Sequence, residues 1–107
     1  MSEQKVIINE TETYKRDLKK LDKSIILQIE KKVDKLKENV FLGKPQKYIK
    51  NLWALHVGKY RIFYTIEEKS VVLLFIWMLT VFHKKDLDGH YPEIFEELNK
   101  LIEKIKS

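Results

Sequence analysis

The most informative segment of the sequence is the run Leu52-Trp53-Ala54-Leu55-His56-Val57-Gly58-Lys59-Tyr60-Arg61-Ile62-Phe63-Tyr64. Its middle, Gly58-Lys59, is typical of a two-residue hairpin turn, because glycine in the first central position readily takes a positive φ. From Tyr60 to Ile66 the side chains alternate between two faces with the period of a strand. The segment therefore predicts a hairpin with strands over residues 51–57 and 60–66.

The predicted turn also determines which side chains oppose one another across the hairpin. His56 is expected opposite Arg61, and Ala54 opposite Phe63, all on one face. Directly opposed side chains of an antiparallel pair lie within contact distance. We therefore expect an imidazole, a guanidinium and an aromatic ring to be grouped on one face of the sheet.

Beyond the hairpin, the sequence predicts a long apolar strand and a final helix. Residues 67–70 are polar and predict a turn, and residues 71–82 are apolar at nearly every position. Such a run is expected of a central strand that is covered on both faces. Pro92 suits the first turn of a helix, whose apolar stripe follows at Ile94, Leu98, Leu101 and Ile105.

Upstream of the hairpin, the sequence predicts one strand and two helices. The strand covers residues 4–8, and Asn9 with Glu12 predicts a capping box that opens a helix over residues 10–21. A second helix, capped by Asp22 or Ser24, is expected from apolar residues at helical spacing, namely Ile25, Ile29, Val33, Leu36 and Val40. Gly43 and Pro45 end it, and a basic loop follows.

The element order β-α-α-β-β-β-α predicts a single α+β domain over residues 1–107. Two N-terminal helices and a C-terminal helix are expected to pack on a four-stranded, mainly antiparallel sheet. With 44% hydrophobic residues, a chain of this length can bury a core unaided. It has no cysteine, which excludes disulfides, thiolate zinc sites and cysteine nucleophiles and favours a reducing compartment.

The sequence also argues against a membrane or secreted protein. Its longest apolar stretch, residues 71–82, is shorter than the ~20 residues that a membrane-spanning helix needs. Residues 1–10 lack the apolar core of a signal peptide and carry acids. We expect a cytoplasmic protein with no membrane partner.

Positive charge is concentrated in the first part of the chain. Residues 1–66 hold 15 Lys or Arg against 8 Asp or Glu, whereas residues 67–107 hold 6 against 8. No acid lies between Glu38 and Glu67, and the lysines of that interval are Lys44, Lys47, Lys50 and Lys59. Such a segment suits a polyanion-binding surface, so we predict that these lysines contact RNA. An ordinary lysine-rich solvated surface is the alternative.

The hairpin group has the residues that metal-independent RNA cleavage requires. In that reaction the 2′-hydroxyl of the RNA attacks the adjacent phosphate, while the protein orients the nucleotide, stabilises charge and moves protons. Arg61, one of two arginines in the chain, suits the charge, and His56 suits proton transfer. Phe63 suits stacking on a base. A solvated sheet face without function is the alternative.

The segment after the long strand, residues 82–91, supplies further candidates. His83, Lys84 and Lys85 remain open, together with His56, as the general base, and Tyr91 ends the segment. Its acids and histidines lack the spacing of a metal site. The chain also has no phosphate-binding glycine loop, H-E-x-x-H motif or serine-hydrolase motif. We expect no metal and no cofactor.

Residues 52–64 resemble the L-x-x-L-R-V-G-x-Y-R-V-x-Y hairpin of the RelE/ParE toxin superfamily. The preceding helical pair, and a Phe-His-Lys-Lys strand ending similar to the F-x-K-K of HigB-like members, extend the resemblance over about residues 5–91. The resemblance implies the toxin of a type II toxin–antitoxin system, acting as a ribosome-dependent mRNA endonuclease. It also implies a small acidic antitoxin that neutralises the toxin in a hetero-oligomer.

The resemblance further implies roles for individual residues. Arg61 matches the strand arginine that contacts the scissile phosphate, Lys85 stands where RelE-like enzymes have a second arginine, and Tyr91 matches a late tyrosine. A HigB-like alignment instead uses Lys84 with Lys85 and places Tyr91 at the start of the last helix. The predicted catalytic set is Arg61, His56, Lys84, Lys85 and Tyr91. The predicted RNA-binding set is Lys44, Lys47, Lys50, Lys59, Phe63 and His83.

Two other functions remain open because the sequence departs from the family pattern. His56 replaces the usual arginine, and residues 52–54 stand where RelE has lysines. These departures favour a catalytically inactive relative that keeps the fold as a binding module. A ParE-like inhibitor of DNA gyrase is the other alternative, although the basic group of Arg61, Lys84 and Lys85 argues against it.

Overall fold

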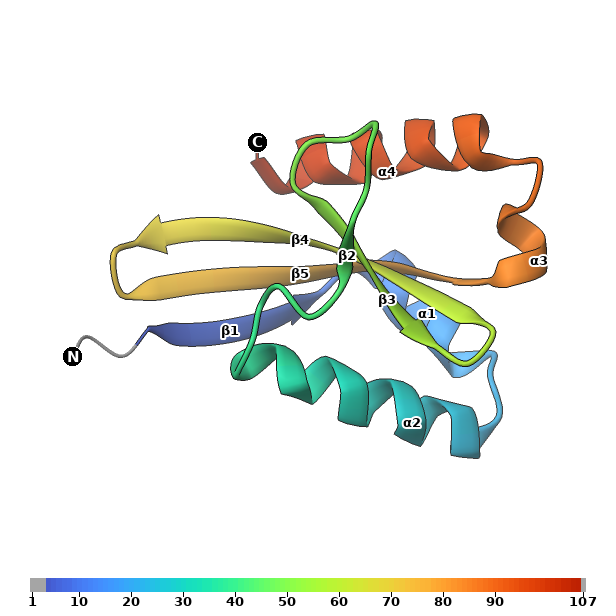
Figure 1. Cartoon of the computed structure of the whole chain (residues 1–107), viewed down its shortest axis with the longest axis horizontal. Coiled ribbons are helices and arrows are strands. Elements are labelled where there is room, and N and C mark those ends of the chain that lie inside the picture. The colour runs from blue at the N-terminus through green and yellow to red at the C-terminus, as the bar shows by residue number, and fades with distance from the viewer. Residues whose placement is uncertain (1–3, 107) are drawn as a thin grey trace.

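Five strands form one mixed sheet in the computed structural model, which describes residues 4–106 (Figure 1). The strands are β1 (Lys5–Glu10), β2 (Lys44–Pro45), β3 (Leu52–Val57), β4 (Tyr60–Ser70) and β5 (Leu73–His83). Their order across the sheet is β1-β5-β4-β3-β2, in which β1 runs parallel to β5 and the other neighbours are antiparallel. The predicted α+β class and mainly antiparallel sheet are confirmed.

One strand, β2, lies in the basic loop, where the sequence predicted none. Its two residues, Lys44 and Pro45, pair with Ala54 and Trp53 at the edge of the sheet. Proline has no N–H to donate and therefore suits edge strands. A strand of two residues also leaves no periodic pattern in the sequence. The prediction of four strands is therefore one strand short.

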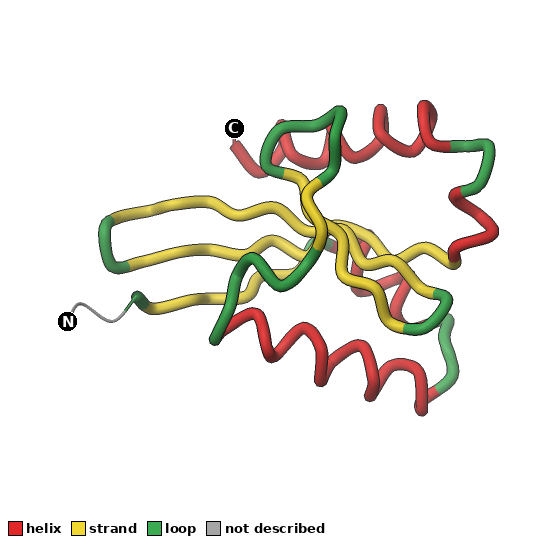
Figure 2. Tube along the Cα trace, viewed as in Figure 1, coloured by secondary structure: helices red, strands yellow, loops and turns green. Residues whose placement is uncertain are grey.

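Helices lie on both sides of this sheet (Figure 2). They are α1 (Glu12–Lys19), α2 (Lys23–Asp34), the 3₁₀ helix η1 (Lys35–Lys37), α3 (Lys84–Leu87) and α4 (Tyr91–Lys106). Tyr14 of α1 and Ile29 of α2 belong to one buried core, and Leu98 of α4 belongs to a second core with Phe63 of the sheet. No helix within residues 4–106 is long and apolar enough to span a membrane.

The β3–β4 hairpin forms as predicted. Gly58 has a φ of 56° in the first central position of the turn. His56 pairs with Arg61, and Ala54 pairs with Phe63. The local turn chemistry therefore sets the register of the two strands that carry the predicted polar group.

The start of α1 differs from the prediction. Asn9 lies in β1, and the helix is capped by Thr11, whose Oγ1 accepts a hydrogen bond from the Tyr14 N–H at 3.0 Å. The same hydroxyl donates to the Leu79 carbonyl at 2.8 Å. Pairing with β5 extends β1 past Asn9, because the ladder satisfies the backbone groups that a helix starting there would leave exposed.

The turn between β4 and β5 also differs. Residues 67–70 were expected to form it, but they extend β4, and the turn falls at Val71 and Val72. These valines are 78% and 50% exposed. The two strands form a long hairpin that projects beyond the helices (Figure 1). Its tip is too far from the core to bury apolar side chains, so hydropathy placed the turn wrongly.

The remaining helices agree with the prediction only in part. α2 ends at Asp34 and continues only as η1, although Val40 is buried as its predicted stripe requires. The predicted polar loop of residues 82–91 contains the short helix α3, and α4 begins at Tyr91. The most buried residues of α4 are Ile94, Leu98 and Ile102. The predicted Leu101 and Ile105 are only half-buried beside them.

Tyr64→Phe is expected to lower the free energy of unfolding by about 1–3 kcal/mol, because it leaves two backbone groups without a partner. The fully buried Tyr64 donates its hydroxyl to the Val40 carbonyl at 2.8 Å and accepts from the Gly43 N–H at 3.0 Å. Urea unfolding followed by circular dichroism measures the change. The matched control Tyr48→Phe alters a side chain that is 81% exposed and should cost less than about 0.5 kcal/mol. Equal losses in both variants would contradict this account.

Candidate functional site

The turn end of the β3–β4 hairpin carries a polar pair. His56 on β3 and Arg61 on β4 are directly opposed. Arg61 Nη1 donates to the carbonyls of Gly58 and Tyr60, at 3.0 Å each. Within residues 4–106, the Nε and Nη2 donors of Arg61 have no hydrogen-bond partner. The guanidinium is therefore anchored on the turn and still has donors for a ligand.

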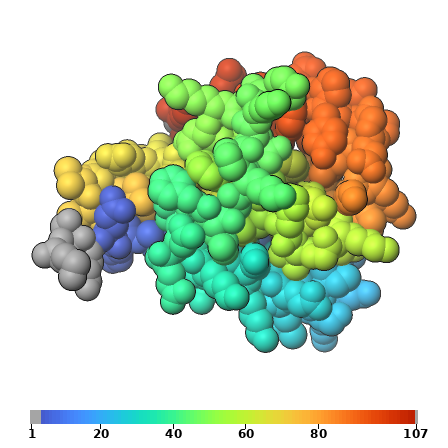
Figure 3. All heavy atoms as spheres, viewed as in Figure 1, coloured from blue at the N-terminus to red at the C-terminus, as the bar shows by residue number. Residues whose placement is uncertain are grey.

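Two lysines from other elements approach this pair. Lys44 in β2 pairs with Ala54, which lies on the same face of β3 as His56. Lys84 begins α3, and its N–H donates to the carbonyl of the turn residue Lys59 at 2.7 Å. The hairpin tip lies at the surface between α3 and the start of α2 (Figure 3). We call the four side chains the hairpin cluster: His56, Arg61, Lys44 and Lys84.

Burial and the nearby cations both affect the pKa of His56. Partial burial lowers the pKa of the imidazole below 6.5, and the positive charges of Arg61, Lys44 and Lys84 lower it further. His56 is therefore neutral near pH 7 and has a ring nitrogen that can accept a proton. The arrangement combines a neutral base with three positive charges.

Lys44→Gln and Lys84→Gln are each expected to raise the pKa of His56 toward 6.5, because each removes a positive charge that disfavours the imidazolium. The matched control is Lys85→Gln, which removes the same charge from the neighbouring residue and is expected to leave the pKa of His56 unchanged. Titration of the His56 imidazole by NMR measures all three. A larger effect of Lys85→Gln than of Lys84→Gln would contradict the arrangement.

Lys85 and His83 lie outside the hairpin cluster. His83 pairs with Tyr60 on the opposite face of the sheet, and the two rings meet edge-on with centroids 5.1 Å apart. Its Nδ1 caps α3 by accepting from the Lys85 N–H at 3.1 Å. Lys85, Tyr60 and Asp17 line a separate hollow of about 410 Å³. The structure therefore separates the adjacent lysines Lys84 and Lys85.

Phe63 is not placed to stack on a base, contrary to the prediction. Its side chain is 1% exposed and belongs to the core beneath α4. The ring packs edge-on against Phe82, with centroids 6.1 Å apart. The alternation of β4 correctly predicted the face of Phe63, but α4 covers that face at Phe63 and leaves it open at Arg61.

The other predicted side chains lie outside the hairpin cluster. Tyr91 is 40% exposed, and its ring lies 5.5 Å from that of Phe95. Lys47 and Lys50 are exposed on the β2–β3 loop, which runs beside α4 (Figure 1), and Lys59 is exposed in the hairpin turn. Within residues 4–106, no side-chain hydrogen bond or ring contact joins these four predicted residues to the hairpin cluster.

Sequence reasoning assigned no role to Tyr48, which the structure places prominently. Its side chain is 81% exposed, and its ring lies 6.2 Å from that of Phe95. Its position between Lys47 and Lys50 could have indicated a role in RNA binding, because bases stack on aromatic rings beside basic residues.

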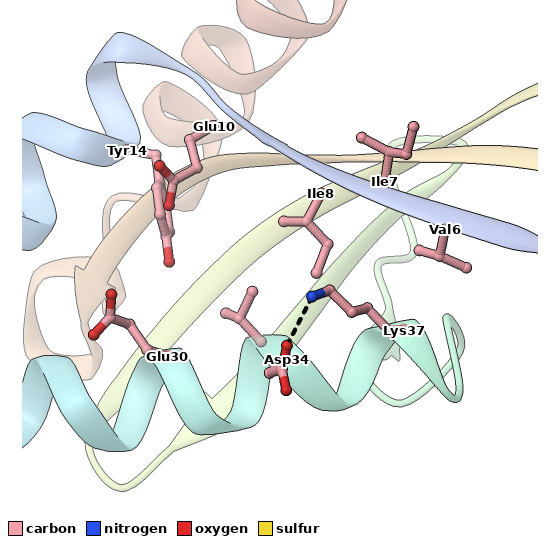
Figure 4. Close-up of a pocket in the computed structure, with 9 residues that line it drawn as sticks. Val6, Ile7, Ile8, Glu10, Tyr14, Glu30, Asp34 and Lys37 are labelled. Carbon is pink, nitrogen blue, oxygen red and sulfur yellow. Dashed lines mark ion pairs between the residues drawn. The ribbon is translucent and has the colours of Figure 1, made fainter.

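The hollow between β1 and α2 has the wrong charge for a polyanion (Figure 4). It measures about 420 Å³ and is lined by three carboxylates, those of Glu10, Glu30 and Asp34. Its single cation, Lys37, is paired with Asp34 at 3.1 Å. Within residues 4–106, no group of three or more His, Cys, Asp or Glu is arranged to hold a metal ion.

Solved structures of toxins have the same fold. The toxin–antitoxin complex RelBE2 of Mycobacterium tuberculosis contains a chain 25% identical to this one, with a TM-score of 0.61 over 75% of this chain and 92% of that chain. A mutant of E. coli toxin RelE in the free state matches with a TM-score of 0.66 and 16% identity, over 88% and 98% of the two chains. The RelB–RelE complex of Methanococcus jannaschii matches with a TM-score of 0.63 and 22% identity, over 78% of this chain and 99% of that chain.

Sequence comparison identifies the family. No curated protein sequence matches the chain at a significant level. The family model of the ParE toxin of the type II toxin–antitoxin system parDE matches residues 8–78, which is more than half of the chain. Together with the hairpin motif and the fold, this match shows that the chain belongs to the ParE toxin family, within the RelE/ParE superfamily of type II toxin–antitoxin toxins.

Proposed function

We propose that the protein is a ribosome-dependent mRNA endonuclease that inhibits translation. The observation that carries this proposal is the hairpin cluster, in which a neutral imidazole lies among one guanidinium and two ammonium groups. Cleavage proceeds by attack of the RNA 2′-hydroxyl on the adjacent phosphate. This reaction forms a cyclic phosphate, releases a 5′-hydroxyl and needs no metal ion.

Each member of the cluster has a role that its position supports. Arg61 has unpaired donors beside the anchored Nη1 and binds the scissile phosphate. Lys44 and Lys84 stabilise the negative charge that develops on the phosphate in the transition state. His56, neutral near pH 7, accepts the proton of the attacking 2′-hydroxyl, and the departing 5′-oxygen takes a proton from water. Burial and the positive charges around His56 lower the pKa of its imidazole and so keep it in the basic form near pH 7.

Residues outside the hairpin cluster hold the RNA chain. Because Phe63 is buried, the bases stack on the exposed rings of Tyr48 and Tyr91 instead. Lys47 and Lys50 contact phosphates beside Tyr48, and these contacts should make binding weaken steeply with salt. The antitoxin is proposed to be a small acidic protein that forms a hetero-oligomer and covers the basic surface. Several related toxins were solved as complexes with RelB.

A ParE-like function is the second candidate, because the matching family model is that of the ParE toxin. Such a protein would inhibit DNA gyrase through protein contacts and leave mRNA intact. An inactive relative would do neither. The hairpin cluster favours the nuclease, since a protein inhibitor of gyrase needs no neutral base among cations.

The test is primer extension on a reporter mRNA in a cell-free translation reaction, with and without the purified protein. We expect cuts within the translated region that disappear when translation is blocked before initiation. Cutting of bare RNA by micromolar protein would overturn the requirement for the ribosome. Intact mRNA with inhibited supercoiling by gyrase would establish the ParE-like function instead. Intact mRNA with normal translation and normal gyrase would identify an inactive relative.

A further inference from the structure

The second arginine of the chain, Arg16, has no part in the proposed reaction. It lies on α1 and contributes to the lining of a hollow of about 320 Å³ between α1 and α4. The floor of this hollow is Thr80 of β5, beyond the end of the pairing with β1 at Met78. The hollow therefore opens along the one stretch of β5 that β1 does not cover.

The lining of the hollow is mainly basic. Arg16, Lys100 and Lys104 contribute three positive charges, and Glu97 contributes one negative charge. The nearest acid to Arg16 is Asp17, whose Oδ1 lies 3.8 Å from Arg16 Nε, and the arginine side chain is 67% exposed. Within residues 4–106, the Nη groups of Arg16 have no partner and are available to a ligand.

The floor of the hollow holds a polar atom without a partner. Thr80 is 2% exposed, and its Oγ1 has no hydrogen-bond partner within residues 4–106. Buried hydroxyl groups are nearly always hydrogen-bonded, so an orphaned one indicates a missing partner. Thr13 of α1 adds a second hydroxyl to the lining.

We propose that this hollow is a binding site for a phosphate group. A guanidinium presents parallel N–H donors that match two phosphate oxygens, and the lysine Lys100 adds charge. Rotation of the Thr80 side chain toward the hollow lets its hydroxyl donate to a third oxygen, which gives Oγ1 its missing partner. The phosphate belongs either to a free mononucleotide or to an RNA backbone. The proposal goes beyond the cleavage reaction and does not rest on it.

NMR titration of the whole protein tests the proposal with three probes: inorganic phosphate, adenosine 5′-monophosphate and a hexaribonucleotide without a terminal phosphate. We expect amide shifts at Thr13, Thr80 and Lys100. Arg16→Gln should weaken binding about ten-fold by removing a charge-assisted contact. The matched control Lys31→Gln, on α2, should not. Amide shifts with inorganic phosphate and adenosine 5′-monophosphate identify a free phosphate as the ligand. Amide shifts with the hexaribonucleotide alone identify RNA as the ligand.

Thr80→Val separates a ligand site from a packing defect. It removes the orphaned hydroxyl and keeps the shape, so it should leave the thermal midpoint unchanged or raise it. At the same time it should weaken phosphate binding several-fold. A higher midpoint with unchanged binding would overturn the role of Thr80. Binding that is unaffected by both Arg16→Gln and Thr80→Val, or tighter binding of acetate than of phosphate, would overturn the site.

Discussion

Arg61→Ala is expected to reduce ribosome-dependent mRNA cleavage by about 10²–10³-fold, the usual effect of removing one donor that stabilises transition-state charge. Arg61 is the only member of the hairpin cluster with a permanent planar fork, and its Nη1 is fixed by the carbonyls of Gly58 and Tyr60. This anchoring places the remaining donors before RNA arrives, so little reorganisation is needed. Single-turnover primer extension on translating ribosomes measures the loss.

Three controls separate this effect from changes in folding or in total charge. Arg61→Lys keeps the charge but loses the fork, so it should recover only part of the rate. The Lys31→Ala variant loses one charge at an exposed position of α2 outside the hairpin cluster and should cleave mRNA normally. Thermal unfolding of Arg61→Ala checks that the turn still forms. Full cleavage by a folded Arg61→Ala protein would remove the basis of the proposed mechanism.

Phe63→Ala is expected to lower the free energy of unfolding by about 3–5 kcal/mol, because it opens a cavity under α4. The side chain is 1% exposed, and its ring packs on Phe82. A loss of this size is a large part of the 5–15 kcal/mol that stabilises a typical domain. Urea unfolding of the purified variant measures it.

Phe63→Leu distinguishes this core role from the base-stacking role that the sequence suggested. Leucine fills most of the space, so stability should fall by only about 1–2 kcal/mol. The cleavage rate at a temperature where the variant is folded should equal that of the wild type. If Phe63 instead stacked on a base, leucine would slow cleavage without a comparable loss of stability. Tyr48→Leu is the matched change at an exposed ring, and it should slow cleavage without a comparable loss of stability.

The part of the fold that local chemistry specifies was predictable from the sequence. The Gly58-Lys59 turn fixes the register of β3 and β4, so these two residues were enough to predict that His56 lies opposite Arg61. The helical period of α2 likewise predicted the burial of Ile29 and Val33. In each case, one short-range pattern was sufficient because no distant segment competes with it.

Features that depend on distant segments were not predictable. The cap of α1 moved from Asn9 to Thr11 because β5 pairs with β1. Alternation placed Phe63 and Arg61 on one face, but it contains no information on where α4 ends over that face. The difference between Lys84 and Lys85 likewise depends on how α3 is joined to the hairpin turn through the Lys59 carbonyl.

The parallel pairing of β1 with β5 has a consequence for the order of folding. Lys5 pairs with Leu73, so β1 cannot pair with β5 until most of the chain has been synthesised. Contacts between such distant segments slow folding, because the intervening chain must be closed into a loop. Lys84 follows directly after β5. A chain interrupted within β5 during synthesis therefore lacks part of the strand that pairs with β1 and also lacks Lys84 of the hairpin cluster, and we expect such a fragment to have no nuclease activity.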